Sequence, residues 1–434
     1  MDVATLAATI LVVGIFGLIL LGAPISVAVG LSSVLAAVSV LGLEGGSIVS
    51  AQRLFRGINS FSLLAIPFFV LAGVIMNNGG IALRLINAAK VLVGRMPGSL
   101  AQTNVAANAL FGAVSGSAVA AVAAVGSTMA PLQAKDGYDK SFAAATNIAS
   151  APAGMLIPPS NLMIVYSLVS STSIAALFVA GYVPGILWAA TCMVIVYLYV
   201  RKHPELKITE RQTWGQRAKI LLDAVPSLLL IVVVIGGILA GFFTPTEASC
   251  IAVLYALVLS FAYKAIKVKD LGPILLDAAR TTSIVMFLIG VSTIMSFVLS
   301  FTGIPAKVAE AMLGISENVT VLLLLIALVL LIVGCFMDPT PAVLIFAPIF
   351  LPVVIELGVD PVHFGILMVF NLCIGTITPP VGPVLFVGAR VAGLRIEDVI
   401  RRLLPFFAAL VVMLLVVMFF PQLSLWLPTQ LGLL

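Results

Sequence analysis

The sequence predicts an all-α polytopic membrane protein made of two inverted repeats, each with five spans, one re-entrant hairpin and one broken helix. Three observations lead to this prediction. Of the 434 residues, 62% are hydrophobic and only 9% are charged, whereas soluble domains carry about 25% charged residues. The apolar runs continue for about twenty residues, as a membrane-crossing helix requires, and lack the alternation of membrane barrels. Finally, a Pro-Pro pair interrupts one such run in each half of the chain.

The two pairs, Pro158-Pro159 and Pro379-Pro380, are 221 positions apart. A prolyl pair removes two backbone donors and breaks a helix, so a bilayer tolerates it only where the freed carbonyls face protein, water or an ion. Further residues coincide at the same offset: Pro24 with Pro245, Pro131 with Pro352, Gly137 with Gly358, Asp139 with Asp360, Gly154 with Gly375, and Pro184 with Pro405. Matching halves predict structural repeats with the substrate site at their interface.

Residues 1–200 are expected to form the first repeat. Its spans are 4–21, 25–41, 61–76, a broken helix at about 141–169, and 174–200. Residues 100–134 form two arms of about fifteen residues, short for a crossing that needs about twenty. They predict a re-entrant hairpin whose tip is Ser115-Gly116-Ser117. The polar stretch 201–221 is expected to connect the halves.

Residues 222–434 are expected to form the second repeat. It has spans at 224–242, 248–263 and 281–299, a hairpin at about 319–357 with its tip at 334–339, a broken helix at about 362–391, and a span at 399–420. Because five crossings is an odd number, this repeat should enter the bilayer upside down relative to the first. Residues 81–93 and 304–313 mix charged and apolar residues, which is typical of helices lying along the membrane surface.

The loop charges predict the orientation. With the amino terminus outside, 19 of the 22 Lys and Arg residues fall on the cytoplasmic side, and only Arg53, Arg56 and Lys307 fall outside. Since cytoplasmic loops are enriched in Lys and Arg, both termini are expected to face outward. The basic residues form no patch, so the net charge of +5 predicts no nucleic-acid partner.

Candidate cation ligands lie at the hairpin tips and helix breaks, where unpaired carbonyls and amides can hold a small ion at mid-depth. The first tip and break contribute Ser115, Gly116, Ser117, Asn147, Pro152 and Gly154, and the second contribute Gly334, Asp338, Gly375, Thr376 and Thr378. We expect the first tip to face residues 151–154 and Asp338 to face residues 375–378.

Asp338 and Glu247 are the two carboxylates in deeply apolar surroundings. A bare charge at that depth costs a few kcal/mol, so Asp338 should have a cation partner. It is interpreted as a Na⁺ ligand or proton carrier, or alternatively as the N-cap of a helix that starts at Pro339, and the two roles are compatible. Glu247 is expected to cap a helix.

Candidate substrate contacts lie next to the Pro-Pro pairs: Ser160, Asn161, Asn371, Pro379 and Pro380. The alternative for the polar members, hydrogen bonds to the local backbone, stays open. The chain has no GxxxxGK[ST] or HExxH motif. No catalytic residue, no metal other than sodium and no organic cofactor is expected.

Longer strings resemble one family. They are Gly334–Pro339, Ala347–Pro352, Leu357–Gly365 and Ile377–Gly382 in the second half, with Ile157–Ser160 and Phe243–Ala248 in agreement. Together they are similar to the large membrane subunit of tripartite ATP-independent periplasmic (TRAP) transporters. The similarity covers essentially the whole chain.

The resemblance implies an elevator-type secondary transporter of the ion-transporter superfamily. The expected location is the bacterial inner membrane, with both termini periplasmic as the loop charges predict. The resemblance also implies Na⁺ as coupling ion, import of a small carboxylate delivered by a periplasmic substrate-binding protein, and a small four-helix membrane subunit, expected as a separate chain. The Na⁺ sites would be the two tip-and-break pairs, with the substrate carboxylate between them. The lipid bilayer is the remaining partner.

Three other functions compete with this interpretation. The nearest is a single-component sodium/dicarboxylate symporter of the same fold, which would transport without a binding protein. An intramembrane enzyme using Asp338 would need a second acid or nucleophile at the same depth, and none is evident. A non-transporting scaffold gives no reason for costly breaks at mid-membrane.

Overall fold

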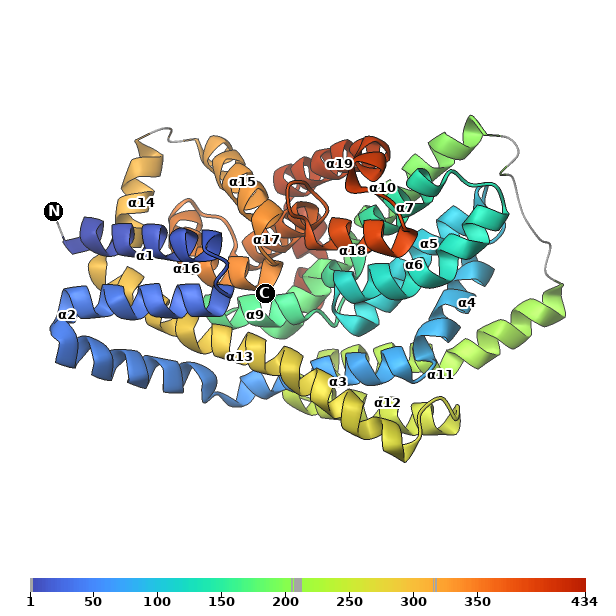
Figure 1. The fold of residues 1–434 in the computed structure, drawn as a ribbon, viewed down its shortest axis with the longest axis horizontal. Helices are drawn as coiled ribbons and strands as arrows, with labels where there is room; N and C mark the ends of the chain where they lie inside the picture. The colour runs from blue at the N-terminus through green and yellow to red at the C-terminus, as the bar shows by residue number, and fades with distance from the viewer. Residues whose placement is uncertain (1–2, 204–205, 207–212, 315, 317) are drawn as a thin grey trace.

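The computed structural model describes residues 3–203, 206, 213–314, 316 and 318–434. Every regular element in these ranges is a helix (Figure 1). Among the described residues, nine helices are long and apolar enough to cross a membrane, or up to eleven if bent pairs count as one span. The chain is therefore a multi-pass helical membrane protein, which confirms the all-α polytopic part of the prediction. Of the expected connector, residues 204–205 and 207–212 lie outside the described part.

The first helices are α1 (Val3–Leu20), α2 (Ile25–Ile58), the 3-10 turn η1 (Phe61–Leu64), α3 (Ala65–Asn78) and α4 (Ile81–Val93). The helix predicted to end at residue 41 continues after an interruption at Gly42, where φ is 77°. A Cβ on Gly46 would lie 2.6 Å from the Val38 Cα, so the chain folds back on itself at Gly42. The returning part then packs along α13 (Leu271–Thr302).

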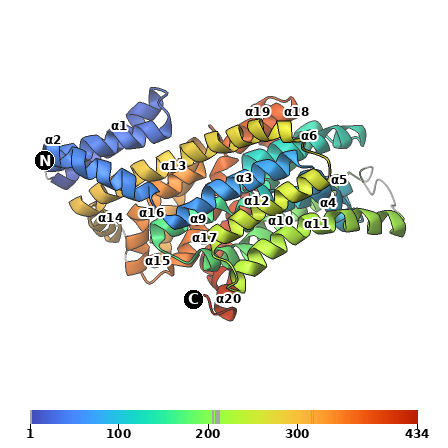
Figure 2. The same cartoon turned by 90° about the horizontal axis from the view of Figure 1, so that it is seen from below.

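The corresponding helices of the second half are α11 (Trp214–Leu239), α12 (Pro245–Ala262), the 3-10 turn η3 (Val268–Asp270), α13 and α14 (Ile304–Leu313). The helix α13 begins at Leu271 instead of Thr281, because its polar first turns remain helical beyond the apolar stretch. It runs beside α2 and α3 in both views (Figures 1 and 2). The amino terminus and α14 lie at one end of the long axis, and α4 lies toward the other.

The helix α4 bends 72° away from α3 and is fixed to α11 and α12 by one side chain. The Arg84 Nε lies 3.0 Å from the Asp223 Oδ2. The Arg84 guanidinium carbon also lies 3.4 Å from the centre of the Tyr263 ring. This arginine therefore joins the helix that leads into the first hairpin to two long helices of the second half.

The two hairpins are α5 (Ser99–Ser115) with α6 (Ala118–Lys135), and α15 (Val319–Phe336) with α16 (Pro339–Glu356). The interrupted helices that follow are α7 (Lys140–Ser150), α8 (Ala153–Leu156) and α9 (Asn161–Ser170), and then α17 (Pro361–Thr376) and α18 (Pro383–Ala392). Both Pro-Pro segments are non-helical, and their Pro-Pro peptide bonds are cis. The helices α16 and α17 start 221 positions after α6 and α7.

The remaining helices are α10 (Ile174–Arg201), α19 (Ile396–Phe419) and α20 (Gln422–Gln430). The short α20 was not expected, because nine residues that include Pro428 are too few for a membrane span. It packs on α10 and α17. The core lies around α7 and α17, which are buried continuously over Phe142–Ser150 and Val362–Thr376. These two buried helices carry the breaks that form the candidate site.

Candidate functional site

A central cavity of about 310 Å³ lies where both hairpin tips and both helix breaks meet. Its polar lining comes from both halves of the chain: Gly116 and Ser117, Asn161, Asp338 and Thr340, and Thr376. The side of the cavity formed by α3 and α13 is mostly apolar, and its residues are Ile66, Val70, Thr281, Ile284 and Val285. The structure thus brings five sequence-predicted residues, Gly116, Ser117, Asn161, Asp338 and Thr376, into one cavity.

Four helices begin at this cavity. The first-turn residues of α6, α9, α16 and α18 all line it: Ala118, Asn161, Pro339 and Pro383 among them. Helix N-termini carry unpaired N–H groups and the positive end of the helix dipole, so they favour anions. The arrangement therefore suits an anionic group in a space that apolar helices surround.

The first tip is held by backbone and hydroxyl contacts. Gly116 has a φ of 63°, and its N–H donates to the Gly112 carbonyl at 2.8 Å. The Ser117 hydroxyl accepts from the Ala120 N–H at 3.3 Å and caps α6. A Cβ on Gly116 would lie 2.9 Å from the Asn161 Nδ2. The tip therefore packs against the start of α9, while the break at residues 151–154 contacts the hairpin one turn earlier.

That earlier contact is a backbone-to-backbone approach of two glycines. A Cβ on Gly154 would lie 2.1 Å from the Gly112 Cα, so no side chain fits. Beside it, the fully buried Trp188 donates its indole N–H to the Ala149 carbonyl at 2.8 Å. Pro152 has no backbone N–H to donate, so the helix is interrupted at this point. The glycine contact and the Trp188 hydrogen bond hold the chain in place beside the interruption.

Asn147 joins α7 to both arms of the first hairpin. Its Nδ2 donates to the Val122 carbonyl of α6 at 2.8 Å, and its Oδ1 accepts from the Asn108 Nδ2 of α5 at 2.9 Å. Its side chain therefore holds the hairpin in place, and Asn147 does not line the central cavity.

The second tip repeats the glycine contact and adds hydrogen bonds. A Cβ on Gly375 would lie 2.5 Å from the Gly334 Cα. The Cys335 carbonyl accepts from the N–H groups of Val381 and Gly382 at 3.2 and 3.1 Å. The tip of the second hairpin is thus bonded directly to the second break.

Two carbonyl oxygens converge at this break. A Cβ on Gly382, where φ is 46°, would lie 2.8 Å from the Thr378 carbonyl oxygen and 3.0 Å from that of Thr376. The hydroxyls of the two threonines donate to carbonyls of their own helix, at 2.7 Å each. Thr376 and Thr378 can therefore offer backbone oxygens to a cation, the apparatus that unwound helices use.

Asp338 caps α16 and is exposed to the cavity. Its Oδ1 accepts from the Thr340 N–H at 3.1 Å, and Pro339 is the first helical residue. Among the residues that the structure describes, no Lys or Arg forms an ion pair with Asp338. The Thr340 hydroxyl also forms a hydrogen bond with the carboxylate, so Asp338 has polar partners but no countercharge among the described residues.

The other predicted substrate residues lie elsewhere. The Ser160 hydroxyl is buried, donates to the Met155 carbonyl at 2.5 Å and caps α9. The Asn371 Nδ2 donates to the Ala327 carbonyl of α15 at 2.7 Å, away from the central cavity. Pro379 and Pro380 are exposed and also lie outside that lining.

The sequence reasoning missed Thr340 and Thr281. Thr340 stands two positions after Asp338, so its place in the capping sequence could have identified it. Thr281 lies on α13, and the sequence of this apolar span does not indicate which face of the helix lines the cavity. The Thr281 hydroxyl donates to the Asp277 carbonyl of the same helix at 3.1 Å.

Glu247 has the capping role expected of it. Its carboxylate accepts from the Thr244 N–H at 2.8 Å, and the Thr244 hydroxyl accepts in turn from the Glu247 N–H at 3.3 Å. This reciprocal capping box starts α12.

Comparisons with known proteins agree with this architecture. A family model described as "Tripartite ATP-independent periplasmic transporter, DctM component" matches residues 12–423. The protein YgiK of Salmonella typhimurium is 53% identical and covers 99% of both chains. The C4-dicarboxylate TRAP transporter large permease protein DctM of Pseudomonas aeruginosa is 41% identical, covering 88% of this chain and 90% of the relative. The sialic acid TRAP transporter large permease protein SiaM of Vibrio cholerae is 38% identical, covering 96% and 97%.

Among solved structures, the YdaH transporter of Alcanivorax borkumensis has a TM-score of 0.64 and 14% identity, covering 89% of this chain and 90% of that one. At that identity the likeness concerns the fold alone. The family match spans nearly the whole sequence, and the relatives align along most of their length. The chain therefore belongs to the DctM family of tripartite ATP-independent periplasmic transporters, and is a component of a secondary transporter and not an enzyme.

Proposed function

We propose that this chain imports a small organic acid across the bacterial inner membrane together with Na⁺. The observation that carries the proposal is the central cavity, where four helix N-termini, two hairpin tips and the unpaired carboxylate of Asp338 meet. Na⁺ is the only cofactor in this scheme.

The substrate class follows from the charge of the lining. The cavity holds no basic side chain among its described lining residues. A carboxylate would therefore be bound by the helix N-termini, which favour anions, and by the Asn161 amide. The relatives named for C4-dicarboxylate, sialic acid and 2,3-diketo-L-gulonate transport support an organic acid.

Sodium coupling is proposed from the oxygens beside the cavity. The Thr376 and Thr378 carbonyls converge at the second break, and Asp338 adds a negative charge at the adjoining tip. A Na⁺ ion held there would supply the countercharge that Asp338 lacks, and its charge would attract a carboxylate. At the first tip, Ser115, Gly116 and Ser117 with the break at Pro152 and Gly154 are proposed as the second ion site.

The movement is proposed as an elevator. The unit formed by α5–α9 and α15–α18 would slide against the helices α1–α3 and α11–α13. The mostly apolar wall that α3 and α13 present to the cavity supports sliding, because few polar bonds must break there. The helix starts 221 positions apart support residues 1–200 and 222–434 as inverted repeats. Both termini are proposed to be periplasmic because most Lys and Arg residues then lie on the cytoplasmic side.

The proposed partners are a small four-helix membrane subunit and a periplasmic substrate-binding protein. The family description as a tripartite periplasmic transporter supports them. The isethionate TRAP transporter permease protein DctMQ of Oleidesulfovibrio alaskensis matches over 65% of its length, so that relative carries additional sequence.

Reconstitution in liposomes tests the proposal. Uptake of candidate carboxylates would be measured with an inward Na⁺ gradient, with and without the small subunit and the binding protein. We expect uptake only when Na⁺ and both partners are present. Uptake by the chain alone would favour the single-component symporter, and uptake independent of Na⁺ would overturn the coupling.

A matched pair of variants tests the ion site. Asn caps a helix about as well as Asp, so Asp338→Asn should keep α16 intact but remove the charge facing the cavity. We expect the Na⁺ concentration for half-maximal uptake to rise about tenfold. Asp360→Asn is the control, because Asp360 also caps a proline-started helix but lies outside the central cavity. Equal Na⁺ activation in both variants would contradict the assignment.

A further inference from the structure

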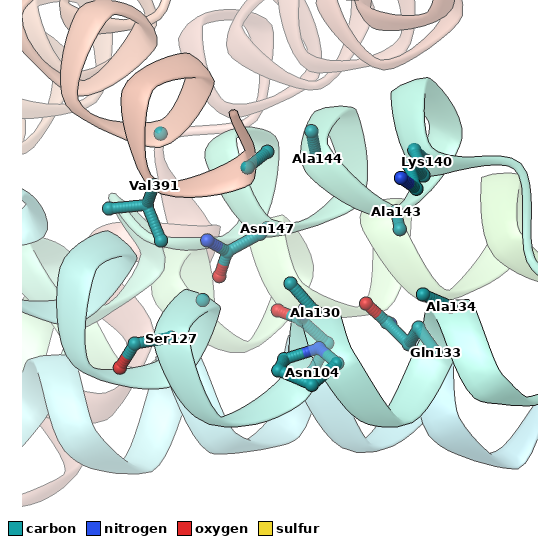
Figure 3. A pocket seen from close by; sticks show the side chains of 14 residues that line it. Asn104, Ser127, Ala130, Gln133, Ala134, Lys140, Ala143, Ala144, Asn147 and Val391 are labelled. Carbon is teal, nitrogen blue, oxygen red and sulfur yellow. The ribbon is translucent and has the colours of Figure 1, made fainter. Parts of the chain in front are cut away.

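A second cavity, of about 390 Å³, lies between α6, α7 and α18, with Asn104 of α5 also in its lining (Figure 3). It shares no lining residue with the central cavity. On α6 the two linings are separated by about two helical turns, between Val119 and Gly126. It is therefore a separate space, to which the proposed transport function assigns no role.

Three carboxamide side chains line this cavity: Asn104, Gln133 and Asn147. In Figure 3, Asn147 and Lys140 come from α7 on one side, and Asn104 and Gln133 lie on the opposite side. Asn147 and Gln133 donate their amide hydrogens to backbone carbonyls, at 2.8 and 3.4 Å. Each of these two amide nitrogens thus already has an acceptor.

Asn104 is different. Its side chain is only 1% exposed, and its Oδ1 accepts from the Asn108 Nδ2 at 2.9 Å. Its Nδ2 is buried and has no acceptor among the described residues. Buried donors in proteins are almost always paired, so the Asn104 amide needs an acceptor that the described residues do not provide.

Among the residues that the structure describes, Lys140 is the only charged one in the lining. It is exposed and forms no ion pair with a described residue. The adjacent Asp139 cannot neutralise it, because its Oδ2 lies 2.8 Å from the Arg402 Nε and its Oδ1 accepts from the Ser141 N–H. The cavity thus offers a free cation and a free amide donor.

We propose that this cavity binds a small oxyanion, either a soluble carboxylate or the phosphate of a lipid headgroup. The Lys140 ammonium group and the Asn104 amide would donate to it, since charge-assisted hydrogen bonds are the strong ones. The anion would lie between a hairpin arm, α6, and the far half of an interrupted helix, α18. Because the two donors belong to α7 and α5, its binding would join these two helices.

Thiol protection tests this proposal on the purified full-length chain. Ser127 lines the cavity and is exposed, so Ser127→Cys provides a reporter. The one exposed native cysteine, Cys250, is replaced by Ser; the other three cysteines are buried. We expect succinate to slow maleimide labelling of the reporter, or an anionic lipid to do so.

A matched pair of lysine variants tests whether the Lys140 ammonium group binds the anion. Lys140→Gln should raise the half-protecting concentration about tenfold or more. Lys135→Gln, on the same surface but outside the lining, should leave it unchanged. No protection by either ligand, or equal protection in Lys140→Gln and the parent, would overturn the proposal.

Two further arms identify the source of the anion. Nanodiscs containing phosphatidylglycerol, compared with phosphatidylcholine alone, protect the reporter without succinate if a lipid phosphate occupies the cavity. Protection by succinate in detergent alone identifies the soluble carboxylate. Asn161→Ala, in the central cavity, should not alter protection; its loss in that variant would mean that the central cavity produces the effect, which overturns the proposal.

Discussion

Gly375→Ala is expected to separate the second hairpin tip from the second break. The added Cβ would lie 2.5 Å from the Gly334 Cα and carbonyl carbon, whereas carbon atoms pack at about 3.5–4.0 Å. The two backbones must therefore move apart by about 1 Å. Forcing an extra carbon into such packing costs about 1–3 kcal/mol.

The separation also acts on the hydrogen bonds beside it. The Cys335 carbonyl accepts from Val381 and Gly382 at 3.2 and 3.1 Å, already near the upper limit for such bonds. Their loss would add about 1 kcal/mol each. It would also displace the neighbouring Thr376 and Thr378 carbonyls, so Na⁺ affinity should fall together with stability.

The assay is the apparent melting temperature of the purified protein, followed by the Na⁺ dependence of uptake. Gly236→Ala is the control, because Gly236 lies in α11 and, apart from its chain neighbours and the nearby backbone of that helix, no described atom lies within 4 Å of its added Cβ. Alanine favours a helix over glycine by up to about 1 kcal/mol, so this control should be neutral or slightly stabilising. Equal melting temperatures and equal Na⁺ activation in Gly375→Ala and wild type would refute the reasoning.

Three other substitutions have defined outcomes. Thr378→Val removes the hydroxyl bond to the Ile374 carbonyl that holds the Thr378 backbone in place; the Thr378 carbonyl should shift and Na⁺ activation of uptake should weaken, with surface expression unchanged. Arg84→Gln loses an ion pair and an aromatic contact and should cost about 1–2 kcal/mol in thermal unfolding; Arg395→Gln, in a largely exposed pair, should cost almost nothing. Trp188→Phe leaves the Ala149 carbonyl without its indole donor and should cost about 1–2 kcal/mol, whereas Trp214→Phe, 76% exposed, should be silent.

The positions of Asn371 and Thr376 illustrate where sequence reasoning ends. Both are polar residues on α17, and both are buried. Five positions rotate a side chain by about 140° around a helix, so the two face different neighbours. Thr376 lines the central cavity, while Asn371 donates to α15. The sequence gives the angle between the two side chains around α17, but it does not show which neighbouring helix each of them faces.

In the first half, the hydrogen-bond partners of Asn147 likewise depend on the tertiary packing. Its place one turn before a helix break makes it a reasonable ion ligand by sequence. The structure uses its amide to join α5, α6 and α7. Ser160 likewise satisfies its hydroxyl with the local backbone. Polar groups in an apolar interior take the nearest partner, and that partner depends on packing.

The sequence by itself determined the membrane class, most helix positions and the two interruptions, because these depend on local properties: the length of an apolar run and the missing donors of proline. Only the tertiary structure decided the reversal at Gly42 and the meeting of Ser117, Asn161, Asp338 and Thr376 around one cavity. Those four residues come from segments up to 259 positions apart. Their proximity arises from close glycine contacts between helices, and such contacts depend on how whole helices pack rather than on any local pattern.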